Sequence, residues 1–203
     1  MKKVIAYVDG FNLYFGLKEK GWRQFYWLNI QLLVQNLLKS EQQLIVTKYF
    51  TARVIGSPDK EKRQSTFIEA LETLSNFEIF YGKYQLNPRY CQNCGFQDNV
   101  PNEKMTDVNI AVEMLSDAFN DKFDVALLIS ADSDLTPLIR SIKQMFPHKY
   151  IVVVFPPKRY STELTTVADA LLHINRAMLT RSVFPDKIKK ADGFILQHPA
   201  TWK

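Results

Sequence analysis

The stretch that decides the fold is Ile129-Ser130-Ala131-Asp132-Ser133-Asp134-Leu135-Thr136-Pro137-Leu138. A strand candidate, residues 124–129, precedes the acids and has the length of a buried strand. Beyond them, apolar residues recur at helical spacing, and Pro137 stands in the first turn, where its missing N–H is harmless. Asp132 and Asp134 are therefore expected where a strand ends and a helix begins. In parallel α/β sheets this is the edge that binds ligands.

A second acidic strand end lies near the N-terminus, where the apolar run Val4–Val8 is followed by Asp9-Gly10-Phe11-Asn12. Asp9 directly follows a buried strand and shows no obvious role in a helix. Right-handed crossovers place all strand-to-helix loops of a parallel sheet on one edge. We therefore expect Asp9 to lie near Asp132 and Asp134, and these acids together to hold a divalent metal.

The rest of the chain alternates strands with helices. Strands are expected at 4–8, 44–51, 76–81, 124–129, 150–155 and 172–175. Helices are expected at 11–20, 30–38, 57–74, 107–119, 135–145, 162–171 and 176–180. This alternation predicts a parallel sheet with helices on both faces.

The expected helix over 107–119 carries the clearest apolar stripe. The residues predicted to face the core are Val108, Ala111, Val112, Leu115 and Phe119. Thr106 is predicted to cap this helix, and Asp107 could favour its first turn through the helix dipole alone. Asp134 could likewise be only a helix cap.

The composition sets broad limits. With 203 residues, of which 46% are hydrophobic and 23% charged, the chain suits one soluble domain. No apolar run approaches the roughly 20 residues of a membrane span, so no membrane partner is expected. Two cysteines make no disulfide scaffold, which favours the cytoplasm. The net charge of +5, combined with acids gathered at strand ends, suits a polyanion held against metal ions.

The pattern breaks down over residues 82–102, which are expected to form a loop or hairpin insertion. Cations and aromatics are mixed there, as suits single-stranded nucleic acid, although a plain hairpin is equally favoured. They are Lys83, Tyr84, Arg89, Tyr90 and Phe96. Residues 1–180 are expected to form one domain, and residues 181–203 a C-terminal tail packed on it or extending from it.

Cys91 and Cys94 have the spacing of half a zinc knuckle. A structural zinc site needs four ligands, and the chain has no other cysteine. Three interpretations stay open: a degenerate knuckle, a site shared across a dimer, or a simple turn. Zinc held within one chain is not expected.

Three motifs resemble those of the NYN branch of the PIN-like ribonucleases, and within it the LabA-like proteins. They are Val8-Asp9-Gly10-Phe11-Asn12, Lys104-Met105-Thr106-Asp107-Val108 and Ser130-Ala131-Asp132-Ser133-Asp134-Leu135. The tail Leu179–Trp202 is similar to that group too, so the resemblance covers nearly the whole chain. It implies a three-layer αβα PIN-like fold whose mostly parallel sheet has about five to six strands. It also implies a Mg²⁺- or Mn²⁺-dependent nuclease acting on single-stranded or structured RNA.

The resemblance assigns the family's acidic cluster to Asp9, Asp107, Asp132 and Asp134. Asp9 and Asp132 would be the main metal ligands, and the other two would complete the shell or orient the attacking water. The glycine that often precedes the helix acid in this family is replaced by Met105-Thr106.

Four more residues are candidates for contact with the substrate. Asn12 and Ser130 match polar positions of the family and could hydrogen-bond to phosphate or to the carboxylates. Lys104 and Arg159 could pair with the RNA backbone.

Two other functions compete with the nuclease. The first is a non-catalytic RNA- or protein-binding module of the same fold, and a homodimer is left open. The second is a phosphatase-like enzyme with Asp9 as nucleophile. It matches poorly, because Phe11 stands where that class usually carries a second Asp.

Overall fold

The computed structural model describes residues 1–202, except for the side chains of residues 86–87 and 98–102. Within this range a central sheet has six strands in the order β3-β2-β1-β6-β7-β8, and every neighbouring pair is parallel. The strands are β1 (Lys2–Asp9), β2 (Gln42–Thr51), β3 (Phe77–Tyr81), β6 (Val125–Ile129), β7 (Tyr150–Phe155) and β8 (Ala170–His173). Two antiparallel pairs stand apart, β4 (Lys83–Tyr90) with β5 (Gln97–Lys104), and β9 (Lys187–Lys189) with β10 (Ile195–Gln197). The predicted parallel α/β sheet is confirmed.

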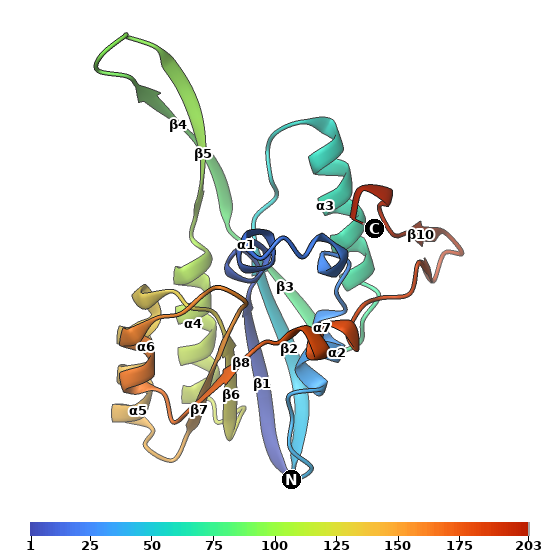
Figure 1. Ribbon diagram of the computed structural model, residues 1–203. Helices are drawn as coiled ribbons and strands as arrows, with labels where there is room; N and C mark the ends of the chain where they lie inside the picture. Colours follow the sequence, from blue (N-terminus) through green and yellow to red (C-terminus); the bar gives the residue numbers. More distant parts are fainter. Residues whose placement is uncertain (203) are drawn as a thin grey trace.

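Helices cover both faces of the sheet (Figure 1). The α-helices are α1 (Gly10–Glu19), α2 (Ile30–Gln35), α3 (Pro58–Leu71), α4 (Thr106–Phe119), α5 (Thr136–Met145), α6 (Thr162–Val167) and α7 (Arg176–Thr180). Short 3₁₀ turns are η1 (Arg23–Phe25), η2 (Ser133–Leu135) and η3 (Ala200–Trp202). In the described part of the chain no helix is long and apolar enough to cross a membrane.

The boundary between α6 and β8 differs from the prediction. The expected helix 162–171 ends at Val167, because Ala168 is extended and residues 170–173 pair with β7 as the last strand. The predicted strand at 172–175 was therefore placed two residues too late.

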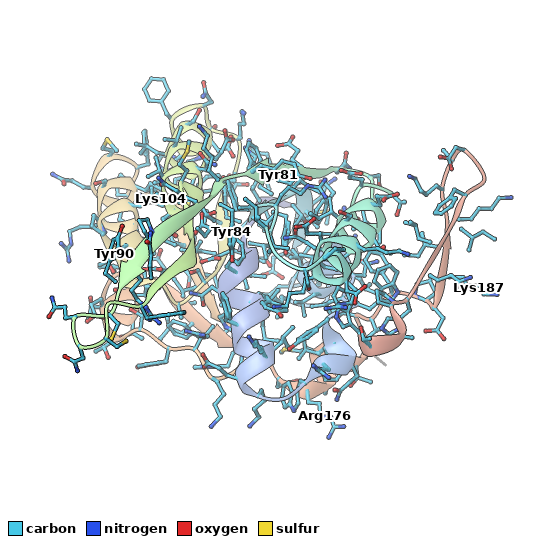
Figure 2. The ribbon with its side chains drawn as sticks, turned by 90° about the horizontal axis from the view of Figure 1, so that it is seen from above. Tyr81, Tyr84, Tyr90, Lys104, Arg176 and Lys187 are labelled. Carbon is cyan, nitrogen blue, oxygen red and sulfur yellow. The ribbon has the colours of Figure 1, made fainter. Side chains whose placement is uncertain are left out.

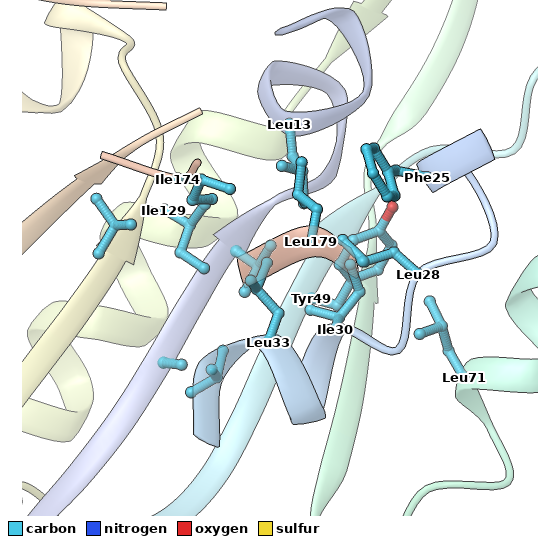
Figure 3. Packing of buried hydrophobic residues seen from close by; sticks show 14 of the residues in the cluster. Leu13, Phe25, Leu28, Ile30, Leu33, Tyr49, Leu71, Ile129, Ile174 and Leu179 are labelled. Atoms are coloured by element: carbon cyan, nitrogen blue, oxygen red, sulfur yellow. The ribbon is translucent and has the colours of Figure 1, made fainter. Parts of the chain in front are cut away.

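Alternate residues of β1 enter two separate cores. Val4, Ala6 and Val8 pack with α1, α2 and the C-terminal segment, whereas Ile5 and Tyr7 pack with α4, α5 and α6. Because both faces are covered, the strand reads as a continuous apolar run. Figure 3 shows the first core, in which Leu13, Leu33 and Leu179 from three helices meet on one face of the sheet.

The predicted core stripe of α4 was wrong in part: Ala111 and Leu115 pack, partly buried, against the core that contains Tyr7, but the other three residues do not. Val108, Val112 and Phe119 are 61%, 59% and 75% exposed, whereas Ile110 and Met114 are fully buried. The helix carries two apolar stripes, and the buried one includes the carboxylate of Asp117. A charged residue in that stripe made it look like the solvent face.

Asp117 is buried because partners from two strands reach it. Its carboxylate accepts a hydrogen bond from the Tyr7 hydroxyl at 2.8 Å and lies 2.6 Å from the Lys48 ammonium. Lys48 also pairs with Glu113 at 2.7 Å, and the exposed Lys122 reaches Asp117 at 3.0 Å. Burial alone raises the pKa of Asp117, but the hydrogen bonds from Lys48, Tyr7 and Lys122 outweigh it and hold that pKa below its usual value. This network locks α4 onto β1 and β2.

The C-terminal segment closes the first core. The Phe184 N–H donates to the Trp27 carbonyl at 3.0 Å, and the Trp27 indole N–H donates to the Pro185 carbonyl at 2.9 Å. The His198 ring stacks on Trp27 with centroids 5.5 Å apart. Phe184 and Leu196 are buried in the same cluster, so this segment completes the core.

We expect the stability of the fold to decline below about pH 4 through Asp117. Its pKa is depressed in the folded chain, so its ionised form stabilises the fold above the unfolded value of about 4. That stabilisation is lost as the pH falls through the lower folded value. Asp117→Asn should lower the free energy of unfolding at pH 7 by about 3 kcal/mol and flatten this acid decline, measured by urea denaturation.

Lys122→Ala is the matched control, because it removes only the 54% exposed partner of the same carboxylate and should cost under about 1 kcal/mol. A variant Asp117→Asn as stable as the parent at pH 7 would contradict the role given to this network.

Candidate active site

Asp9 is both the last residue of β1 and the N-cap of α1. Its Oδ1 accepts the Asn12 backbone N–H at 2.9 Å, so the side chain caps α1. The expectation that Asp9 has no helix role was therefore wrong. The side chain is nevertheless unusual for a cap, because the residue is only 4% exposed.

The neighbouring strand end supplies the other partner of Asp9. The Ser130 hydroxyl, fully buried just after β6, donates to Asp9 Oδ2 at 2.9 Å. In the same direction, the Ala131 backbone N–H donates to Asn12 Oδ1 at 3.1 Å. Because β1 and β6 are adjacent, these two hydrogen bonds join the two acidic loops into one edge.

The second loop orders its own acids. The Asp132 N–H donates to Ser130 Oγ at 3.1 Å, and Asp132 Oδ1 accepts the Asp134 N–H at 2.9 Å. Asp132, and not Asp134, is thus the cap of η2, which corrects the alternative raised for Asp134. The Asp134 side chain is exposed, so its carboxylate is left facing solvent.

Asp107 enters from a third element, the first turn of α4. The predicted cap at Thr106 was wrong, because Thr106 is already helical and Met105 precedes the helix with φ +80°. Glu103 takes the capping role: its Oε1 accepts the Thr106 N–H at 3.0 Å and also the Thr106 hydroxyl. Met105 occupies a left-handed conformation that favours glycine, which accounts for the glycine usual at this point in the family the motifs resemble.

The four aspartates act on one another electrostatically. Burial raises the pKa of Asp9 to about 7, against the lowering effect of the Asn12 N–H and the Ser130 hydroxyl, and Asp107 and Asp132 add to the rise. Burial also raises the pKa of Asp107 to about 6, helped by Asp132, Glu103 and Asp134. The acids predicted from distant parts of the sequence are thus brought to one edge, where their negative charges reinforce each other.

The donors of this edge fit a hard divalent cation. They are carboxylates and a hydroxyl, the oxygen ligands that Mg²⁺ and Mn²⁺ prefer, and a cation would relieve the repulsion that raises the pKa of Asp9 and Asp107. Among the described residues, however, no three His, Cys, Asp or Glu side chains are near enough to hold an ion as they stand. Mg²⁺ commonly keeps several waters and uses only one or two carboxylates, so this spacing suits a hydrated ion.

The two predicted cations have different surroundings. Lys104 is exposed at the end of β5, three residues before Asp107. Arg159 is ion-paired with Glu19 at the end of α1 and partly buried. Arg159 would have to exchange this partner before binding a phosphate.

An aromatic cluster flanks the acidic edge. Phe11, next to Asp9 in the first loop, stacks with Phe15 at 6.2 Å and contacts Tyr84 of β4 at 5.9 Å. Tyr14 continues the cluster, with its ring 5.4 Å from that of Phe15. Figure 2 shows Tyr84 at the root of the β4–β5 hairpin and Tyr90 farther out along it. We call Phe11, Tyr14, Phe15 and Tyr84 the aromatic cluster below.

Of the aromatic cluster the sequence pattern indicated only Tyr84, and it did not indicate Glu103. The spacing of Phe11, Tyr14 and Phe15 is that of one helix face, which by itself predicts only a helix. Glu103 stands three residues before Thr106 in the sequence. Its capping role depends on the left-handed conformation of Met105, which no sequence pattern predicts.

The parallel sheet and the acidic carboxyl edge define an α/β protein of the PIN-like class. The family model for the NYN domain matches residues 3–175, and the chain belongs to this family, a PIN-like ribonuclease family. The predicted membership of the NYN branch and the predicted fold class are confirmed.

Two individual proteins are similar to the chain. It is 26% identical over 176 residues to 6-hydroxy-3-succinoylpyridine 3-monooxygenase HspA of Pseudomonas putida strain S16, a match covering 68% of the chain. The match covers 54% of HspA, so the chain spans about half the length of this curated relative. A crystal structure of a protein of unknown function from Vibrio parahaemolyticus RIMD 2210633 superposes with a TM-score of 0.59 at 21% identity. That match covers 90% of this chain and 96% of the other, and it supports the fold alone.

We expect Gly10→Ala to disturb the acidic edge through a clash with β2. An added Cβ would lie 2.5 Å from the Tyr49 hydroxyl oxygen and 2.8 Å from the Phe50 carbonyl oxygen, so the Asp9 loop would have to shift. The free energy of unfolding should fall by roughly 1–3 kcal/mol in urea denaturation. Gly56→Ala is the control, because its Cβ would meet nothing within 4 Å and should leave stability unchanged. Equal stabilities for the two variants would show that Asp9 does not need this close packing.

Proposed function

We propose that the chain is a metal-dependent endoribonuclease that hydrolyses RNA phosphodiester bonds at Asp9, Asp107, Asp132 and Asp134. One observation carries the proposal: the buried carboxylate of Asp9 is hydrogen-bonded to the adjacent strand end, and acids from two other elements surround it. Membership of a PIN-like ribonuclease family supports the same reaction class. The activity named for HspA belongs to a protein of which the match covers only 54%, so it is not carried over to this chain.

The acids divide into fixed and free carboxylates. Asp9 is held by two hydrogen bonds, and Asp132 is held by its bonds to Asp134 and Ser130, so both are oriented before any ligand arrives. We assign Mg²⁺ or Mn²⁺ to these two, directly or through water. Asp107 and Asp134 are left to complete the shell or to orient the attacking water.

The divalent ion, when bound, would lower the pKa of water and neutralise charge building on the phosphate. The chain's own residues do the remaining work. Ser130 keeps the Asp9 carboxylate aimed at the edge, and Asn12 fixes the distance between the two loops through Ala131. Preorganised groups of this kind favour the transition state because they need no rearrangement during the reaction.

Single-stranded RNA is the substrate class that the surroundings of the acids favour. The aromatic cluster lies directly beside Asp9 and offers rings on which bases can stack. Lys18 lies 5.7 Å from the centroid of the Phe15 ring, so a cation for the phosphate backbone accompanies the stacking surface. Lys104, at the base of the same hairpin as Tyr84 and three residues before Asp107, offers a second cation to the RNA backbone.

Replacing either fixed acid should abolish cleavage. Asp9→Asn and Asp132→Asn should each lower the rate of Mn²⁺-dependent cleavage of a labelled RNA by about 100-fold or more, because several kcal/mol of charge stabilisation are lost. Circular dichroism of each variant shows whether it is folded.

Glu41→Gln is the matched control, since it neutralises an exposed acid that precedes β2 at the opposite edge of the sheet and should cut normally. Cleavage by Asp9→Asn and Asp132→Asn at the parental rate would contradict the proposal. A parental protein that binds RNA in a salt-dependent manner but never cuts it would instead be the binding module of the same fold.

The aromatic cluster should contribute to RNA affinity. Tyr84→Ala should weaken binding of a short single-stranded RNA by roughly 10-fold, since one stacked base contributes about 1–3 kcal/mol. Fluorescence anisotropy measures this in Ca²⁺, in place of Mg²⁺ or Mn²⁺. Tyr150→Ala removes an exposed ring at the amino end of β7 and should bind as the parent does. Equal weakening in the two variants would rule out a specific stacking role.

A further inference from the structure

The β4–β5 hairpin projects from the body of the protein, beyond the carboxyl ends of the central strands (Figure 1). Its strands pair in antiparallel register from Lys83 opposite Lys104 to Tyr90 opposite Gln97. Eight residues at about 3.4 Å each give an arm of roughly 27 Å. Its tip therefore stands well clear of the acidic edge.

The tip is a tight turn built around two thiols. The Cys91 N–H donates to the Phe96 carbonyl at 2.8 Å, and the Gly95 N–H donates to the Cys91 carbonyl at 2.9 Å. Gly95 has φ +69°, a conformation that suits glycine, and a Cβ there would meet nothing within 4 Å. The backbone conformation thus folds the chain back on itself immediately after Cys94.

The turn places the two cysteines three residues apart on one short loop closed by backbone hydrogen bonds. Hydrogen bonding from the Cys94 thiol and from the backbone N–H groups of Cys94 and Asn93 lowers the pKa of Cys91. Both cysteines are free and exposed. Two solvent-accessible cysteines on such a turn can bind a soft metal ion as thiolates.

We propose that this tip is half of a tetrathiolate zinc site, which Cys91 and Cys94 of a second copy of the chain complete. A structural zinc site is tetrahedral and takes four ligands, and the Cys-x-x-Cys spacing supplies two of them. The sequence has no third cysteine, and no third His, Asp or Glu joins the pair among the described residues. A two-fold axis through the metal supplies the missing pair from an identical tip.

The arm explains why a second copy is the fitting partner. Two arms joined at their tips hold the two bodies apart, so the junction needs no complementary surface beyond the turns themselves. An identical chain also presents the same two thiols in the same conformation, as an isologous contact requires.

The junction would also orient the two acidic edges. Only Met105 separates the end of β5 at Lys104 from α4, and Glu103 at the end of the arm caps the helix that carries Asp107. Gly82 packs against the same place, since its Cβ would lie 2.6 Å from the Lys104 carbonyl oxygen. The inference does not rest on the proposed nuclease activity, because zinc content and mass test it without RNA.

The test measures zinc and mass on the full chain, purified under reducing conditions with zinc and then dialysed. Elemental mass spectrometry should find one zinc ion per two chains, and native mass spectrometry should find a dimer that a chelator converts to monomers. The double variant Cys91→Ser, Cys94→Ser should bind no zinc and stay monomeric, with an unchanged circular dichroism spectrum. Gln92→Ala, at the same tip, should behave as the parent.

Co²⁺ provides an independent readout of the ligands. Titrated into the metal-free parent, it should give sulfur-to-cobalt charge-transfer absorption that saturates at one ion per two chains. Four results would each overturn the proposal: a zinc-free monomer, one zinc ion per chain in a monomer, a Cys91–Cys94 disulfide under these conditions, or a dimer that persists in the double variant.

Discussion

The hydrogen bond from Ser130 to Asp9 is the interaction on which the candidate site depends. It joins the ends of two adjacent parallel strands and satisfies a carboxylate that would otherwise be buried at considerable cost. The hydrogen bond from the Ala131 N–H to Asn12 joins the same two loops in the same direction. With both in place, two loops separated by about 120 residues along the chain behave as one rigid edge. Asp107 is positioned separately, by α4, whose first turn Glu103 caps.

Capping and function are not alternatives in this protein. Asp9 and Asp132 each cap a helical turn, and the hydrogen bonds of the cap are what orient the remaining carboxylate oxygens. A sequence argument weighs a helix cap against a metal ligand because it sees only the residue type at a helix start. The structure shows why the choice is false: an ionised carboxylate has several lone pairs, and the cap uses only some of them.

The sequence predicted the sheet and the convergence of the acids because both follow from local pattern plus a general rule of handedness. It failed at α4, where Asp117 is buried by Lys48 and Tyr7, residues more than 65 positions away. No periodicity within the helix can reveal such partners. Met105 and Glu103 were missed for a related reason, since a strained φ angle and a carboxylate outside the helix leave no trace in hydrophobic spacing.

The C-terminal segment bears on where this domain ends. The family match stops at residue 175, yet Phe184 and Leu196 lie in the main core and Trp27 is covered by Pro185 and His198. A fragment trimmed to the end of the family match would leave the indole of Trp27 and its neighbours open to water. Such a fragment would be prone to aggregation and to digestion by proteases, so expressed fragments and domain fusions should retain the chain through Trp202.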